Sequence, residues 1–176
     1  VPSCSLLTIC NQVNQVKRRC QVFSLFTGVF SGSKLKERRI FMNDWSQAIR
    51  VAQETREHAY VPYSEFKVGA AIKFTHSDTI TGGCNVENGY YGATICAERG
   101  AIMKAIAEEG AGKLEYVVVV TDTEEPVSPC GVCQQVIGEF ASNETRILMI
   151  TLKGKKLEIK FSDLQPHLFR LTDHQH

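Results

Sequence analysis

Apolar side chains recur every three or four positions between residues 43 and 61, and this spacing predicts an amphipathic helix. Asn43 or Asp44 is expected to cap its start, because a short polar side chain can accept a hydrogen bond from the first free backbone N–H groups. Pro62 is expected to end it, since the residue before a proline avoids the α conformation. The apolar positions are Trp45, Ala48, Ile49, Ala52 and Ala59.

The pattern changes after the proline. Residues 66–74 and 80–86 read as two strands, and the polar turn at residues 75–78 predicts that they form a hairpin. An alanine-rich helix is expected over residues 94–109, where Gly110 would end it.

The segment 116–120 is a continuous run of β-branched side chains after one tyrosine. Such runs are typical of strands buried on both faces, and therefore of a sheet that helices cover on both sides. A helix over residues 130–140, strands over 146–152 and 157–161, and a short helix over 162–167 complete the pattern. The order αββαβαββα predicts an α/β protein, a three-layer α/β/α sandwich with a five-stranded mixed sheet.

Residues 1–41 differ from the rest of the chain. They lack a sustained helical or strand period and carry seven Lys or Arg against one Glu, a balance of +6. Basic, acid-poor segments can be organelle-targeting peptides, yet no amphipathic helix with regularly spaced arginines emerges. We therefore favour an N-terminal extension outside the core, followed by one functional domain over residues 42–176, and the targeting alternative stays open.

Charge and composition narrow the class of partner. The whole chain carries +1, so residues 42–176 carry −5, which offers no bulk attraction for nucleic acid. A small-molecule substrate fits this balance better. No apolar run approaches the ~20 residues of a membrane span. Seven cysteines in a chain of this length favour a reducing, cytoplasmic setting over a disulfide framework.

Two short segments carry the candidate chemistry: Cys96-Ala97-Glu98, and Pro129 to Cys133. Both fall at expected helix starts, where free N–H groups and the helix dipole favour thiolates. Cys130 and Cys133 are three positions apart and therefore share a helical face. Three thiolates leave the fourth tetrahedral position of a zinc ion open for water, whose pKa the metal lowers towards ~7, and Glu98 can move protons beside it.

Each part of this pattern has a simpler explanation by itself. A lone C-x-x-C is more often a structural zinc clip or a redox pair, and a glutamate in a first helical turn is favourable with the dipole. The combination matches the known signature of zinc deaminases, which indicates catalysis. Arg99 is expected to offset the excess negative charge of three thiolates, and Cys84, at a strand end, to be a small core residue.

Four blocks of the sequence form a longer pattern: Pro62-Tyr63-Ser64-x-Phe66-x-Val68-Gly69-Ala70, Gly83-Cys84-Asn85-Val86-Glu87-Asn88, Ile95-Cys96-Ala97-Glu98-Arg99 and Ser128-Pro129-Cys130-Gly131-Val132-Cys133-Gln134-Gln135-Val136. In these blocks, their order and their spacing, residues 42–169 resemble the cytidine deaminases of nucleoside salvage. Gly92, Gln134 and Gln165 depart from the residues frequent in that family. These departures affect the expected subunit contacts and leave the chemistry intact.

The resemblance implies a role for each matching residue. Cys96, Cys130 and Cys133 match the ligands of one zinc ion per subunit, and Glu98 matches the proton shuttle. The substrate-binding residues that it implies are Asn85 and Glu87 for the ribose hydroxyls, Phe66 beside the pyrimidine, Ala97 next to Glu98, and Tyr91 and Phe169 as residues shared between subunits of a homotetramer.

The chemistry of a carboxylate beside an amide suits sugar hydroxyls, although an Asx-type turn is the alternative for Asn85. The expected activity is hydrolytic deamination of cytidine and deoxycytidine to uridine and deoxyuridine in pyrimidine salvage, with zinc-bound hydroxide attacking C4. Two alternatives stay open. One is a deaminase for a related aminopyrimidine nucleoside, and the other is a non-catalytic binding module structured by zinc, which the glutamate argues against.

Overall fold

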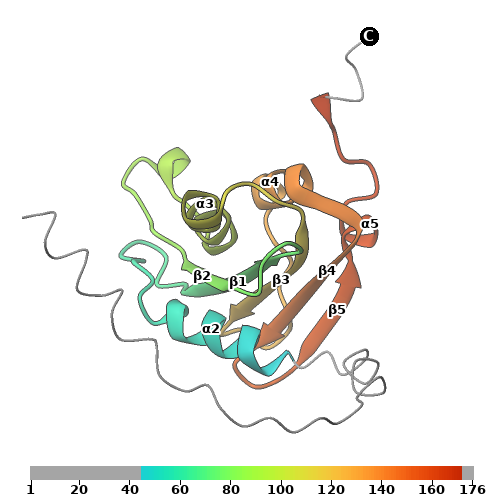
Figure 1. Cartoon of the computed structure of the whole chain (residues 1–176). Coiled ribbons are helices and arrows are strands. Elements are labelled where there is room, and N and C mark those ends of the chain that lie inside the picture. The colour runs from blue at the N-terminus through green and yellow to red at the C-terminus, as the bar shows by residue number, and fades with distance from the viewer. Residues whose placement is uncertain (1–44, 172–176) are drawn as a thin grey trace, which may run out of the picture. The chain divides into compact units, whose positions relative to one another are not determined.

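The computed structural model describes residues 45–171, which form one five-stranded mixed sheet with helices on both of its faces (Figure 1). The strand order is β2-β1-β3-β4-β5. The three-layer α/β/α fold predicted from the sequence is therefore confirmed. The elements, in chain order, are α2 (Ser46–Arg56), β1 (Val68–Phe74), β2 (Ile80–Cys84), the 3-10 helix η2 (Tyr91–Ala93), α3 (Ala97–Glu109), β3 (Leu114–Thr121), α4 (Gly131–Phe140), β4 (Ala141–Thr151), β5 (Lys156–Lys160) and α5 (Phe161–Leu164).

The pairing of the strands is mixed. Strand β1 runs antiparallel to both β2 and β3, β3 runs parallel to β4, and β5 returns antiparallel to β4. The predicted hairpin of β1 and β2 is confirmed. The turn between β4 and β5 contains Gly154, whose φ of 87° suits a residue without a Cβ. Strand β4 starts at Ala141, earlier than predicted, because Ala141 already pairs with Leu114 of β3.

The end of α2 corrects the sequence prediction. The helix ends at Arg56, well before Pro62, and Ala59 lies outside it. The backbone of Tyr60 instead exchanges hydrogen bonds with Asn85 and Glu87 at 3.0 and 2.8 Å, so pairing with a distant segment ends the helix. The predicted caps Asn43 and Asp44 lie outside the described residues, and the structure places the N-cap at Trp45.

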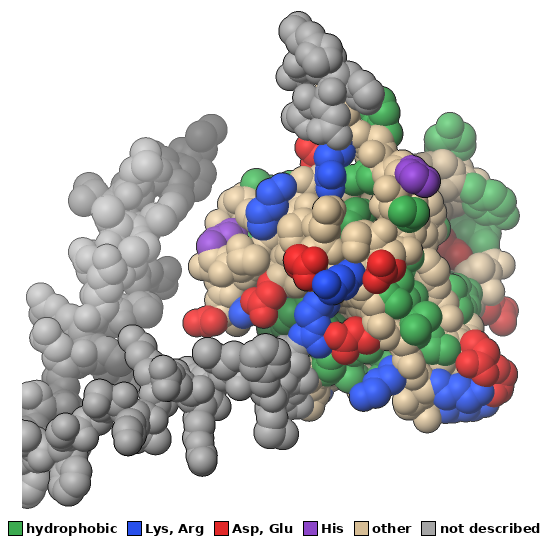
Figure 2. All heavy atoms as spheres, turned by 90° about the vertical axis from the view of Figure 1, so that its right-hand side faces the viewer, with side chains coloured by type: hydrophobic (Ala, Val, Ile, Leu, Met, Phe, Trp, Pro, Cys, Tyr) green, Lys and Arg blue, Asp and Glu red, His purple; other side chains and the backbone are tan. Residues whose placement is uncertain are grey.

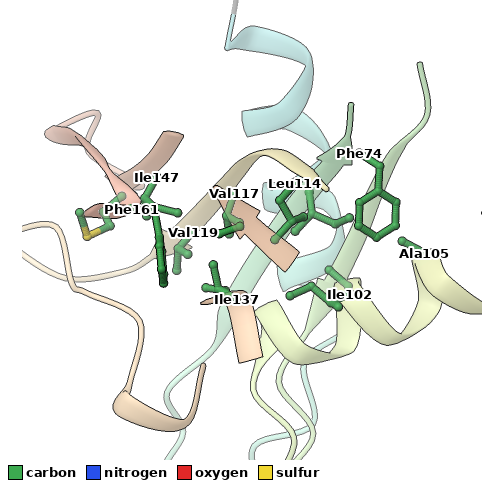
Figure 3. Close-up of a cluster of buried hydrophobic side chains, with 13 residues drawn as sticks. Phe74, Ile102, Ala105, Leu114, Val117, Val119, Ile137, Ile147 and Phe161 are labelled. Carbon is green, nitrogen blue, oxygen red and sulfur yellow. The ribbon is translucent and has the colours of Figure 1, made fainter. Parts of the chain in front are cut away.

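The core has two halves, one on each face of the sheet. Along β3, Val117 and Val119 face α3 and α4, whereas Val118 and Val120 face α2. Figure 3 shows the first half, in which Ile102 of α3, Ile137 of α4 and Phe161 of α5 pack over the sheet. The run of β-branched residues is thus buried on both faces, as predicted.

Charges of both signs are mixed on the face beside β5 (Figure 2). Figure 2 shows Lys and Arg side chains lying among Asp and Glu side chains on this face, with no broad region of one sign. Among the pairs are Arg146 with Glu158, and Lys160 with Glu144 at 2.8 Å. Within the described residues, no helix is long and apolar enough to cross a membrane.

Candidate metal centre and active site

Two helix starts bring the three motif cysteines together. Cys96 and Cys130 are the N-cap residues of α3 and α4, and Cys133 lies in the first turn of α4. Helix α3 begins at Ala97, later than predicted, because Ile95 and Val86 form a β-bridge that keeps the preceding chain extended. The two helices lie side by side on one face of the sheet, so their first turns meet (Figure 1).

The three sulfur atoms are arranged as zinc ligands require. All three Sγ atoms lie within 4.8 Å of one another, and those of Cys96 and Cys130 are 3.8 Å apart. Tetrahedral Zn²⁺ with Zn–S bonds of about 2.3 Å separates its sulfurs by roughly 3.8 Å, so the spacing fits the ion. Among the described residues no fourth ligand joins the cluster, so a zinc ion held by these cysteines would keep one position for water or substrate.

Hydrogen bonds from neighbouring groups stabilise a thiolate in the cluster. The Cys133 thiol, Arg99 and the Cys130 thiol donate to the Cys96 sulfur and lower its pKa to about 5. The same contact with Cys96, together with burial, raises the pKa of Cys133. Because cysteine binds a metal as the thiolate, a divalent cation bound here would displace the thiol protons.

Arg99 supplies a cation next to the sulfurs. Its Nη2 donates to the Cys96 sulfur at 3.4 Å and to the Thr94 carbonyl oxygen at 2.7 Å. Its buried Nε finds no hydrogen-bond partner among the described residues. A guanidinium held this way favours negative charge on the cluster, and its charge-balancing role stays a prediction.

Glu98 is the buried acid of the site. It is 3% exposed and lines a cavity of about 220 Å³, together with Cys96 and Cys130. Burial raises the pKa of its carboxyl, and the negative charge on Cys96 raises it further. A carboxyl with a raised pKa is suited to accept and return protons near neutral pH.

Phe66 and Asn85 line the same cavity. The Asn85 side chain accepts from the Val68 N–H and donates to the Phe66 carbonyl oxygen, both at 2.8 Å. Its amide therefore holds the backbone beside Phe66. Within the described residues, one N–H and one lone pair of this amide remain available for a ligand.

Glu87 does not line this cavity. Its carboxylate accepts hydrogen bonds from the backbone N–H groups of Tyr63 and Ser64, at 2.9 and 3.2 Å, and from the Ser64 hydroxyl. These donors, the hydroxyl first, lower the pKa of the Glu87 carboxyl. Its predicted role in sugar binding stays a prediction.

The structure does not bring every predicted site residue into the cavity of one chain. Tyr91 and Phe169 are 74% and 60% exposed and do not line it. Tyr91 makes an edge-on contact with Tyr63, and the Phe169 carbonyl accepts from Gln135 at 2.9 Å. Ala97 is buried at the start of α3. The prediction that Tyr91 and Phe169 serve a neighbouring subunit stays a prediction.

The structure also adds lining residues that the sequence analysis did not single out. Thr94 and Ser128 lie within two residues of the metal-binding cysteines in the sequence, so they could have been predicted to line the site. No local signal marks Val119 and Thr121, because it is the sheet that turns this end of β3 toward the cysteines.

Comparisons with known proteins agree with this geometry. Residues 42–149 match the family model described as the cytidine and deoxycytidylate deaminase zinc-binding region. The cytidine deaminase of Sporosarcina psychrophila is 44% identical over 130 residues, which cover 74% of this chain and 94% of that protein. The cytidine deaminase of Halalkalibacterium halodurans is 43% identical, over 74% of this chain and 97% of that protein.

Solved structures give the same answer. The crystal structure of cytidine deaminase from Burkholderia pseudomallei superimposes on this chain with a TM-score of 0.66 at 38% identity. The match covers 70% of this chain and 97% of the Burkholderia chain. The cytidine deaminase from Mycobacterium tuberculosis has a TM-score of 0.62 at 35% identity, with 73% and 98% covered. The family of enzymes to which this chain belongs is therefore that of the cytidine and deoxycytidylate deaminases.

Proposed function

We propose that this protein hydrolyses cytidine and deoxycytidine to uridine and deoxyuridine and releases ammonia. The observation that carries the proposal is the shared cavity, in which a buried Glu98 with a raised pKa lies beside Cys96 and Cys130. The relatives named above are cytidine deaminases, which supports the choice of substrate.

Cys96, Cys130 and Cys133 would hold the zinc ion. When bound, zinc supplies Lewis acidity that lowers the pKa of a coordinated water towards ~7. The guanidinium of Arg99 and the two helix starts favour the negative charge that three thiolates bring.

Glu98 would carry protons between water and substrate. Its carboxylate accepts a proton from the attacking water and delivers it to ring N3, while the water oxygen bonds to C4. It then takes the proton of the new C4 hydroxyl and gives it to the amino group, which leaves as ammonia while C4=O forms. The balance is one cytidine and one water consumed, and one uridine and one ammonia formed.

Phe66 and Asn85 would contact the substrate directly, and Glu87 would accept a hydrogen bond from a ribose hydroxyl. A carboxylate makes a charge-assisted bond with a hydroxyl, which favours a nucleoside over the free base. This assignment rests on the cavity lining and on the position of Glu87 two residues after Asn85.

We also propose a homotetramer in which Tyr91 and Phe169 reach a neighbouring subunit's cavity. Their exposure in the single chain supports this arrangement. Light scattering after size exclusion tests the subunit number, and a monomer with full activity would contradict the homotetramer.

Residues 42–176 would form the catalytic domain, which the activity of that fragment tests. The role in salvage is tested in a strain that requires uridine for growth: expression of this protein should let the strain grow on cytidine instead.

The decisive experiment follows the ultraviolet spectrum of cytidine during incubation with the purified zinc-loaded protein. We expect the spectrum to shift to that of uridine, with deoxycytidine converted as well. Cytosine, dCMP and a cytosine-containing oligonucleotide serve as comparison substrates, and we expect little turnover of each. No change with either nucleoside would contradict the proposal.

A further inference from the structure

The turn formed by residues 61–66 links Glu87, the proposed contact of the ribose, with Phe66, the proposed contact of the base. Its backbone closes with a hydrogen bond from the Glu65 N–H to the Val61 carbonyl at 3.1 Å. Glu65 has a φ of 56° and is the one non-glycine residue with positive φ in the described part of the chain. Such a conformation costs free energy and persists where surrounding contacts hold it.

The contacts that hold this turn come from Glu87. A carboxylate offers about four acceptor positions, and three donors of the turn occupy Glu87: the N–H groups of Tyr63 and Ser64 and the Ser64 hydroxyl. Capacity for one further donor remains, which suits a single sugar hydroxyl.

The Ser64 hydroxyl contacts both the Glu87 carboxylate and the backbone of Phe66. It donates to Glu87 and accepts from the backbone N–H of Phe66 at 3.0 Å. The Phe66 carbonyl is held in turn by Asn85, at 2.8 Å. The main chain of Phe66 is therefore fixed on one side through Ser64 and on the other through Asn85.

We propose that Ser64 is a positioning residue for nucleoside binding, which orients the Glu87 carboxylate and the backbone of Phe66 relative to each other. It does not touch the reacting atoms. It sets how the sugar-binding and base-contacting groups are spaced, and so favours substrates that carry both a ribose and a pyrimidine. The inference rests on the proposed function.

No charged side chain competes with Ser64 at this carboxylate. Between residues 45 and 171 no lysine, arginine or histidine pairs with Glu87, and the nearby Lys67 pairs with Glu57 instead. The hydroxyl donor is accordingly the leading cause of the lowered Glu87 pKa.

The test compares Ser64→Ala with Ser64→Thr and with the control Ser77→Ala. Ser77 accepts the N–H of Thr79 at 3.0 Å, the same kind of turn contact, in an exposed turn that lies outside the cavity lining. For Ser64→Ala we expect KM for cytidine, and the dissociation constant of uridine measured by calorimetry, to rise about tenfold, while kcat changes by less than about twofold. Ser64→Thr should recover most of the affinity, and Ser77→Ala should match the wild type.

The pH profile separates positioning from a merely structural role. Loss of the hydroxyl donor raises the Glu87 pKa, so the carboxylate becomes protonated at a higher pH. The rise of KM on acidification should therefore begin at a higher pH in Ser64→Ala than in the wild type.

Two results would overturn the inference while the wild type remains active. One is a KM and pH profile of Ser64→Ala that match the wild type. The other is a joint loss of kcat, melting temperature and zinc content without the shift in pH profile, which would show a structural role only. A wild-type protein that does not deaminate cytidine would overturn the proposed function, and this inference with it.

Discussion

The two glutamates of this site differ in pKa because their surroundings differ. Glu98 and Glu87 are both carboxylates near one cavity, yet burial raises the pKa of the first while hydrogen-bond donors lower that of the second. The first is therefore suited to transfer protons and the second to remain a fixed anion that accepts hydrogen bonds. One residue type thus serves two purposes, because burial dominates at Glu98 and hydrogen-bond donors dominate at Glu87.

Glu98→Gln tests the proton carrier. The amide has nearly the same shape but cannot take up a proton, so we expect kcat to fall by about 10²–10⁴ or more, while zinc content and melting temperature stay near wild type. Steady-state kinetics and elemental analysis measure the two effects. Glu108→Gln, at the exposed end of the same helix, is the control and should keep full activity. Near-normal turnover of Glu98→Gln would refute the role.

Arg99→Gln tests the charge-balancing cation. The guanidinium lowers the pKa of the Cys96 thiol, so its removal should raise that pKa. The acid side of the kcat/KM profile should therefore move to higher pH, and Arg99→Lys, which keeps the charge, should move less. An unchanged profile in the glutamine variant would remove Arg99 from this role.

At the scale of elements, the site depends on how closely α3 approaches the sheet. A Cβ on Gly83 of β2 would lie 2.4 Å from the Ala101 nitrogen and 2.5 Å from the Ala97 oxygen. Only a residue without a side chain allows this approach of α3, which carries Cys96 at its N-cap and Glu98 in its first turn. The metal centre therefore depends on the β1–β2 hairpin as well as on α3.

Gly83→Ala tests this close approach. The obstructing atoms belong to the backbone and cannot rotate away, so we expect a loss of at least about 2 kcal/mol in the free energy of unfolding, measured by urea denaturation. Reduced activity should accompany it, since α3 must shift. Gly100→Ala, whose Cβ would meet its nearest neighbour at an ordinary 3.5 Å, is the control and should be neutral or stabilising. Equal stability of the two variants would contradict the prediction.

At the scale of the whole molecule, the metal centre joins parts of the fold that are remote in sequence. Cys96 follows the hairpin, whereas Cys130 and Cys133 follow β3, so a bound ion would link α3 to α4 across the sheet face. Metal binding to the folded state should therefore also stabilise it.

Zinc removal tests this link. Dialysis against a chelator should lower the melting temperature by about 5–10 °C and abolish deamination, and added zinc should restore both. Cys130→Ala should show the lower melting temperature at the outset and respond little to chelator. Cys84→Ala, which alters a half-buried thiol outside the cluster, should respond to chelator as the wild type does. A melting temperature that is insensitive to chelator in the wild type would contradict a stabilising metal.

By itself the sequence determined the order of the elements, the sheet buried on both faces, and the cysteines and glutamate of the site. These follow from short-range properties: the period of apolar residues, the run at 116–120, and residue types at helix starts. Only the tertiary structure decided where α2 ends, where α3 begins, and that Ser64 connects Glu87 with Phe66. Each of these depends on a contact between segments far apart in the chain, such as Tyr60 with Val86, whose free energy no local pattern contains.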